Sequence, residues 1–141
     1  MTAKIHDCKE ELKEVDLRVT PARLAVMNFL EKTEQPVDVS SVINYLNIKR
    51  VKTDPATVFR IMNTLTQKGI TIPVQFQDGK TRYELSSRKD HHHLICNNCR
   101  RIEDVSDMVV PALEKEIKGK HNFLVKRHSL EFFGLCELCQ H

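Results

Sequence analysis

Four of the five cysteines in this chain fall into two Cys-x-x-Cys pairs, a spacing that suits metal ligation. Two intervening residues let both thiolates of a pair converge on one tetrahedral ion, and a second pair completes the ligand shell of a structural zinc site. Cys-x-x-Cys pairs also serve in redox chemistry, but neither pair here opens a helix after a strand, as a thioredoxin-like centre prefers. We therefore predict that structural zinc is held by Cys96, Cys99, Cys136 and Cys139.

Three consecutive histidines, His91, His92 and His93, stand among acidic residues and indicate a second kind of metal site. If this run is an extended strand, His91 and His93 face one side and His92 faces the other. The first predicted site consists of Glu84, His91, His93 and Asp104. The second consists of Asp90, His92 and His128. Imidazole and carboxylate donors suit Fe, Mn, Zn, Ni or Co without choosing among them. The alternative is a solvated loop that binds no metal.

A third chemical pattern lies in residues 54–69, which predict a helix with a DNA-reading face. Asp54 is a suitable N-cap, and Pro55 suits the first helical position. The apolar residues of the segment recur at helical spacing and should face the core: Val58, Ile61, Met62 and Leu65. The opposite face carries Arg60, which can pair with guanine or a phosphate, and Phe59, which can contact a thymine methyl group. The alternative is a solvated helix face with one stray aromatic residue.

The elements around this helix predict a winged helix-turn-helix. The expected elements are helices at 5–15, 20–30, 39–46 and 54–69, followed by strands at 70–77 and 81–85. The two strands flank Asp78-Gly79, a strong signal for a two-residue hairpin turn. Arg18, just before the second helix, can enter a minor groove. Lys80 and Arg82, on the hairpin that forms the wing, can contact phosphates.

The second half of the chain predicts a small α/β unit. Strands are expected at 94–96, 102–105 and 122–133, and a helix at 109–117. The fold class is therefore α+β: a winged helix-turn-helix domain at 1–85, a polar hinge at 86–89, and a small α/β dimerisation domain at 90–141. A domain of this size usually gains stability from a metal or a partner subunit.

Composition excludes few classes of protein. The net charge of +3 neither demands nor excludes nucleic acid, so the case for DNA rests on local arrangement. The chain has no apolar run near the roughly 20 residues of a membrane span and begins with a polar segment that has no signal-peptide core. We expect a cytosolic protein without a membrane partner.

Together these segments resemble the ferric uptake regulator (Fur) superfamily over nearly the whole chain. The resemblance rests on five ordered motifs at compatible spacings: Arg18-Val19-Thr20-Pro21-Ala22-Arg23, Ala56-Thr57-Val58-Phe59-Arg60, Asp78-Gly79 with Arg82-Tyr83-Glu84-Leu85, His91 through Cys99, and Gly134-Leu135-Cys136-Glu137-Leu138-Cys139.

The resemblance implies a homodimer that binds A/T-rich inverted-repeat operators when loaded with metal and represses genes of metal uptake or oxidative defence. It implies structural zinc on the four cysteines and a second divalent metal, Fe, Mn or Zn, on the regulatory site. Asp90, His92 and His128 would form a third, peripheral site. A small-molecule substrate is not expected. The candidate DNA-contacting residues are Arg18, Arg23, Thr57, Phe59, Arg60, Asn63 and Thr64.

Three positions depart from the family pattern. The family usually supplies a metal ligand, commonly histidine, from the region that here reads Glu34-Gln35-Pro36-Val37, and no histidine occurs from residue 7 to 90. The recognition tyrosine of the family is Phe59, which keeps the ring and lacks the hydroxyl. The helix acid of the third site is Pro111, so that site requires a substitute such as Glu114.

Other functions fit the sequence less well. A zinc deaminase needs His-x-Glu before its Cys-x-x-Cys, which is absent, and four cysteine ligands leave no position for water. Asp104 resembles the peroxide-sensing PerR branch of the family, so a peroxide sensor is one alternative. A zinc-stabilised DNA-binding protein without metal sensing is another, because of the missing hinge histidine.

Overall fold

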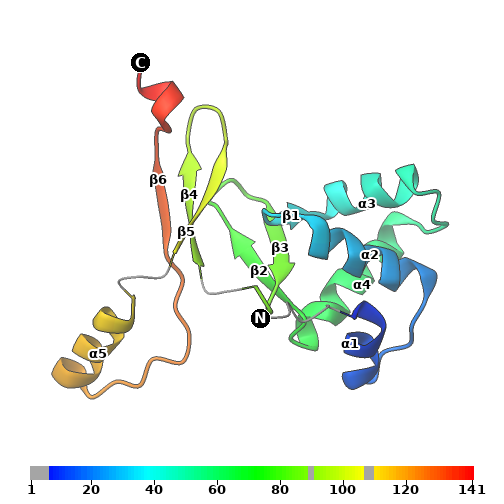
Figure 1. Cartoon of the computed structure of the whole chain (residues 1–141), viewed down its shortest axis with the longest axis horizontal. Helices are drawn as coiled ribbons and strands as arrows, with labels where there is room; N and C mark the ends of the chain where they lie inside the picture. The colour runs from blue at the N-terminus through cyan, green and yellow to red at the C-terminus, as the bar shows by residue number, and fades with distance from the viewer. Residues whose placement is uncertain (1–6, 89–90, 107–109) are drawn as a thin grey trace, which may run out of the picture. The chain divides into compact units, whose positions relative to one another are not determined.

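The computed structural model describes residues 7–88, 91–106 and 110–141. The chain divides into two compact units, Met1–Arg88 and Lys89–His141 (Figure 1). Among the described residues no helix has the length and apolar character needed to cross a membrane. The α+β class predicted from the sequence is confirmed, because the first unit is a helical winged domain and the second is a small sheet with helices.

The first unit combines four helices with a small antiparallel sheet. The helices are α1 (Cys8–Glu14), α2 (Pro21–Lys32), α3 (Val39–Ile48) and α4 (Pro55–Gln67). The sheet, in the order β1-β3-β2, contains β1 (Val37–Asp38), β2 (Thr71–Gln75) and β3 (Thr81–Leu85). This is the expected winged-helix order with a short additional strand, β1, before α3. Ile5 of the first predicted helix lies outside the described residues.

Local capping determines where these helices begin. The Thr20 hydroxyl accepts a hydrogen bond from the backbone N–H of Arg23 at 3.2 Å, and Pro21 occupies the first helical position. Asp54 accepts from the N–H of Thr57 at 2.8 Å, and Pro55 follows it. These contacts satisfy N–H groups that have no partner inside the helix. The helix starts predicted at Thr20 and Asp54 are therefore confirmed.

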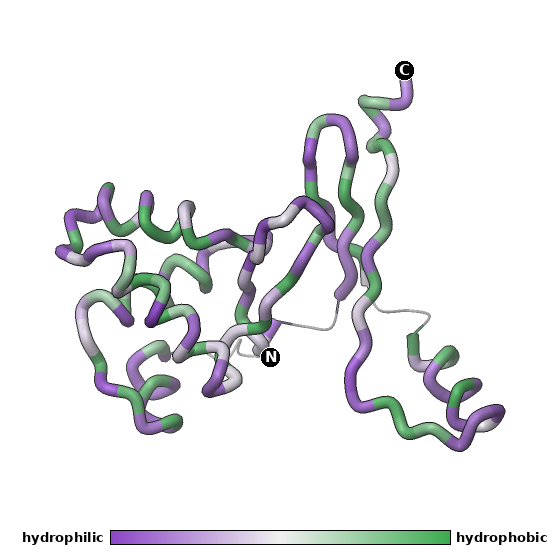
Figure 2. Tube along the Cα trace, turned by 180° about the vertical axis from the view of Figure 1, so that it is seen from behind, coloured by the Kyte–Doolittle hydropathy of each residue, from purple (hydrophilic) through white to green (hydrophobic). Residues whose placement is uncertain are grey.

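The helices of the first unit bury one face each in a shared core, and their hydrophobic and hydrophilic residues alternate along the chain (Figure 2). The stripe predicted for α4 is confirmed, since its members are at most 6% exposed: Val58, Ile61, Met62 and Leu65. Burying one such side chain contributes about 1.5–3 kcal/mol. The core thus fixes which face α4 presents to solvent.

The two-residue turn predicted at Asp78-Gly79 is wrong. Gln75 pairs with Thr81, so the connection runs from Phe76 to Lys80. Within this longer loop the Phe76 side chain is buried, with only 3% of its surface exposed. The Arg82 guanidinium lies 5.1 Å from the centre of the Phe76 ring and donates two hydrogen bonds to Asp78, at 2.8 and 3.1 Å. These contacts, rather than a tight turn, shape the tip of the wing.

The second unit is a three-stranded sheet in the order β5-β4-β6. It contains β4 (His91–Cys96), β5 (Ile102–Ser106), α5 (Val110–His121), β6 (Glu131–Gly134) and the short helix η1 (Glu137–Gln140). Strand β4 is antiparallel to β5 and parallel to β6. Val109, predicted to be helical, lies outside the described residues.

The strand predicted at 122–133 is largely wrong. Only its end forms β6, which pairs with β4, while residues 122–130 belong to no strand. Phe123 and Leu124 in that segment are 62% and 61% exposed. Residues with high strand propensity form a strand only where a neighbouring edge supplies hydrogen bonds, and within the described residues no strand pairs with residues 122–130.

Candidate metal centres and nucleic-acid interface

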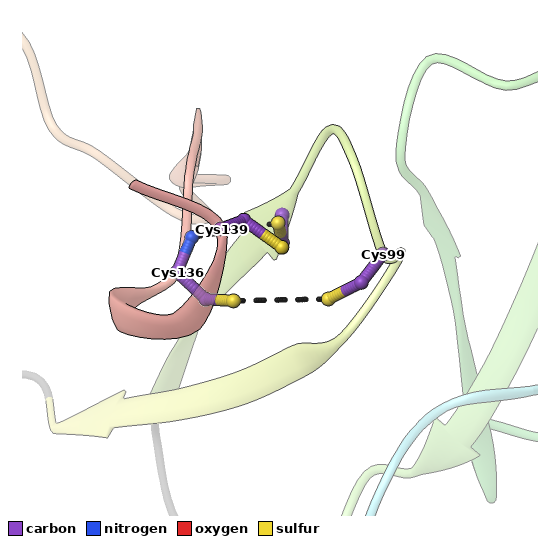
Figure 3. A group of neighbouring side chains, drawn as sticks. Cys99, Cys136 and Cys139 are labelled. Atoms are coloured by element: carbon purple, nitrogen blue, oxygen red, sulfur yellow. Dashed lines mark hydrogen bonds between the residues drawn. The ribbon is translucent and has the colours of Figure 1, made fainter. Parts of the chain in front are cut away.

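The four cysteines of the two pairs converge at one end of the second unit's sheet. Cys96 ends β4, Cys99 lies in the turn that follows, Cys136 is the N-cap of η1, and Cys139 lies within η1. The expectation that neither pair opens a helix after a strand is therefore wrong for the second pair, because the short helix η1 follows β6. Their Sγ atoms all lie within 4.8 Å of one another, and those of Cys99 and Cys136 are 3.7 Å apart (Figure 3). Four thiolates around one zinc ion, each at about 2.3 Å, are separated by roughly 3.8 Å. The donor set therefore fits a tetrahedral zinc site.

Backbone pairing brings the two halves of this site together. The turn after β4 is closed by the N–H of Arg100, which donates to the carbonyl of Cys96 at 3.0 Å. Arg100 adopts a left-handed conformation, with φ of 65°. On the other edge of β4, the parallel register aligns Cys96 with Gly134, and the N–H of Asn97 donates to the Gly134 carbonyl at 2.8 Å. A strand pairing between distant segments thus positions one cysteine pair beside the other.

The local environment favours the metal-binding form of Cys96. The backbone N–H of Cys136 donates to Cys96 Sγ at 3.4 Å, and this bond, with help from the N–H of Cys99, lowers the pKa of the Cys96 thiol to about 6. Because the thiolate is the form that ligates metals, the lowered pKa favours the metal-binding form of Cys96 at neutral pH.

The histidine run forms the first half of β4, so its side chains alternate between the two faces of the sheet. The rings of His91 and His93 share one face and meet edge to face, with centroids 4.8 Å apart. His93 is 4% exposed and pairs across the sheet with Asp104, whose Oδ1 lies 3.8 Å from His93 Nε2. Glu84 belongs to the first unit, on β3, where Arg88 Nη1 donates to its carboxylate at 3.3 Å.

His92 takes part in a separate group on the other face of the sheet. Its ring lies 5.2 Å from that of His128, and His128 Nδ1 lies 3.0 Å from Glu114 Oε1. Glu114 lies one helical turn beyond Pro111 on α5. Glu114 therefore supplies a carboxylate close to Pro111, which has no metal-binding group of its own. Asp90, the third predicted member of this group, lies outside the described residues.

The outward face of α4 presents the side chains that sequence analysis selected for DNA contact. Phe59 is 53% exposed, Arg60 and Asn63 are exposed, and Thr57 and Thr64 are half-buried. The Arg60 guanidinium is not randomly oriented, because its Nη2 donates to the Thr57 hydroxyl at 3.1 Å. The sequence pattern did not reveal this contact, although the i, i+3 spacing of the two residues permits it.

Basic residues outside α4 differ in how exposed they are and in the hydrogen bonds that their side chains make within the protein. Arg18 is exposed, and Arg23 Nη1 donates to its carbonyl oxygen at 3.1 Å, so Arg23 stabilises the loop that carries Arg18. Arg82 is held by Asp78 and is 18% exposed at its side chain. Lys80 is exposed at the wing tip. Among the wing cations we therefore expect Lys80, rather than Arg82, to meet phosphate.

Known proteins are similar to this chain over almost its whole length. Residues 14–133 match the model of the ferric uptake regulator family. The ferric uptake regulation protein of Vibrio cholerae is 33% identical over 131 residues, covering 92% of this chain and 87% of its own. The crystal structure of the Vibrio cholerae regulator superposes with a TM-score of 0.81 at 33% identity, covering 92% of this chain and 100% of that one.

Two further solved structures are similar. The ferric uptake regulator from Francisella tularensis with iron has a TM-score of 0.78 at 25% identity, covering 89% of this chain and 96% of that one. The Campylobacter jejuni peroxide stress regulator has a TM-score of 0.73 at 26% identity, covering 95% and 100% of the two chains. The chain is therefore similar both to a solved ferric uptake regulator and to a solved peroxide stress regulator.

Proposed function

The chain belongs to the ferric uptake regulator family of metal-dependent, DNA-binding transcriptional regulators, and from this premise we propose that it is a homodimeric repressor controlled by a divalent metal bound beside β4. The observation that carries the proposal is the presence of two chemically different donor sets in the second unit. One set consists only of thiols, and the other combines imidazoles with a carboxylate. A regulator acting on DNA would work in the cytosol.

The thiol set is assigned a structural role. Four protein ligands close the tetrahedral shell of zinc and leave no position for water. Such a site stabilises the fold and has no means of activating a hydrolytic nucleophile. This assignment agrees with the small apolar core of the second unit, whose buried hydrophobic residues among those described are Ile95, Cys96, Ile102 and Val110.

The mixed set is assigned a regulatory role, with His91, His93 and Asp104 as ligands and Glu84 as the donor from the wing. A divalent cation, Fe, Mn or Zn, would supply a positive centre that donors from both units can share. Glu84 is especially important because no histidine occurs between residues 7 and 90. Joining the wing to the second unit would bias the dimer toward the arrangement in which both α4 helices reach the operator.

The group on the other face of β4 is assigned as a third site. We assign His92, His128 and Glu114 to it, with Asp90 as a further ligand. The short contact between His128 and Glu114 supports the view that Glu114 replaces the acid missing at Pro111. Of these residues, His92 lies on β4, Glu114 lies on α5, and His128 lies on the segment before β6.

The proposed partner is an A/T-rich inverted-repeat operator, read by α4. Replacing Arg60 with alanine is expected to weaken binding at least about tenfold, because a lost guanidinium contact to a base or phosphate costs about 1–3 kcal/mol at each half-site. The operator is first selected from a random duplex library with the wild-type protein in Mn²⁺. Affinity is then measured by fluorescence anisotropy at fixed salt concentration.

Two matched variants sharpen this test. Lys115→Ala removes the same charge from an exposed position on α5 and should bind normally. Arg60→Lys keeps the charge but loses the planar fork, so it should retain non-specific binding and lose base preference. Wild-type affinity for Arg60→Ala would contradict the role of α4 in reading DNA.

A specific observation supports peroxide sensing as a second candidate. Asp104, rather than a glutamate, adjoins His93, and one solved relative is a peroxide stress regulator. A chain that senses peroxide should lose operator binding when its iron-loaded form meets hydrogen peroxide, with oxidation at His91 or His93. The manganese-loaded form should be insensitive to the same treatment.

A further inference from the structure

Three residues at the start of α4 form a continuous chain of hydrogen bonds. Arg60 Nη2 lies 3.1 Å from Thr57 Oγ1, and Thr57 Oγ1 lies 3.1 Å from Asp54 Oδ2. The other carboxylate oxygen of Asp54, Oδ1, accepts from the backbone N–H of Thr57 at 2.8 Å. The same aspartate therefore begins the helix with one oxygen and holds the Thr57 side chain with the other.

The direction of each hydrogen bond in this chain is determined by the groups involved. A guanidinium only donates, and an ionised carboxylate only accepts. The Thr57 hydroxyl must therefore accept from Arg60 and donate its single hydrogen to Asp54. Hydrogen bonds from the backbone N–H and the hydroxyl of Thr57 lower the pKa of Asp54, which keeps its carboxylate ionised at neutral pH.

This arrangement leaves Arg60 available to DNA. A guanidinium carries five N–H donors, and the bond to Thr57 uses one of them. The remaining donors include the two-pronged edge that can contact the O6 and N7 atoms of guanine or a phosphate. An arginine that is already oriented loses less conformational freedom on binding than one that moves through solvent.

We propose that Thr57 is a positioning residue for Arg60: its hydroxyl, directed by Asp54, orients the guanidinium before DNA arrives. The proposal rests on the proposed function, in which α4 reads the operator. It differs from the simpler view that Thr57 itself contacts DNA. If Thr57 acts through Arg60, replacing Thr57 should no longer change operator affinity once Arg60 has been removed.

A double-mutant cycle on the selected operator tests this. Thr57→Val has nearly the same shape, and Asp54 can still accept from its backbone N–H, so the helix start is retained. We expect Thr57→Val to bind the operator about two- to tenfold more weakly than wild type. Thr57→Ser keeps the hydroxyl and should bind like wild type. In the Arg60→Ala background, Thr57→Val should cause no further loss.

The salt dependence of binding provides a second readout. A Lys or Arg that neutralises a phosphate contributes about one unit to the slope of log affinity against log salt concentration, so the uncharged change Thr57→Val should leave that slope unchanged. Thermal unfolding midpoints confirm that the variants are folded.

The outcomes separate this proposal from the proposed function. An equal loss from Thr57→Val with and without Arg60, or a wild-type affinity for Thr57→Val, would overturn the positioning role while leaving α4 as the reading helix. If Arg60→Ala alone bound like wild type, the reading role of α4 would itself fail.

Discussion

Replacing Cys99 with serine is expected to remove the resident zinc and to unfold the second unit. Structural zinc contributes about 10 kcal/mol or more to the folding of small zinc domains, which matches the whole stability of an ordinary domain, about 5–15 kcal/mol. The second unit has little to offset this loss, because the continuous hydrophobic core of the described residues lies in the first unit. Elemental analysis and a thermal melt provide the measurement.

The expected result is a fall from one zinc per chain to almost none, with loss of the dimer. The melt should keep only the transition that belongs to the first unit. Cys8→Ser is the matched control, because Cys8 is the one cysteine outside the cluster and lies buried in the first unit, with its thiol donating to Glu31 at 3.3 Å. A Cys99→Ser protein that retained a full zinc ion and a folded second unit would rule out the four-cysteine site.

Replacing His91 with alanine is expected to abolish the response of DNA binding to metal while sparing both the zinc and the fold. His91 lies on the same face of β4 as His93 and is only half-buried, so its removal should leave the sheet intact. The coupling between an effector and a ligand is usually about 5- to 150-fold in affinity. We expect the ratio of operator affinities with and without Mn²⁺ to fall from that range to about one.

His121→Ala is the appropriate control, because His121 is an exposed histidine at the end of α5, away from the strand that carries the cluster. It should keep the wild-type ratio. If His91→Ala responded to Mn²⁺ as strongly as wild type, His91 would have no part in sensing, and the sensing site would have to be sought elsewhere.

Features set by local chemistry could be predicted from the sequence. The start and buried face of α4 follow from the cap at Asp54, the proline after it and apolar residues at helical spacing, all of which act within a few residues. The convergence of the cysteines could also be anticipated, because thiol chemistry and spacing allow few alternatives to a shared metal. The division of the histidines depends on strand geometry alone, since side chains alternate along any strand.

Features set by contacts between distant residues could not be predicted in the same way. The wing tip depends on the burial of Phe76 and on Arg82, which reaches it from the next strand. Residues 122–130 have a strand-like composition, but nothing local reveals whether an edge is available to pair with them. The contact between Glu114 and His128 depends on where α5 and the segment before β6 lie in space.

The central claim is that metal controls operator binding by a protein whose structural zinc is already in place. The most direct test compares the affinity of wild-type protein for the selected operator in EDTA with its affinity in Mn²⁺, with one resistant zinc per chain verified in both samples. We predict that Mn²⁺ strengthens binding by about 5- to 150-fold and that a second metal ion per chain is bound. Equal affinities in the two conditions, with no saturable second site, would instead identify a constitutive DNA-binding protein stabilised by zinc.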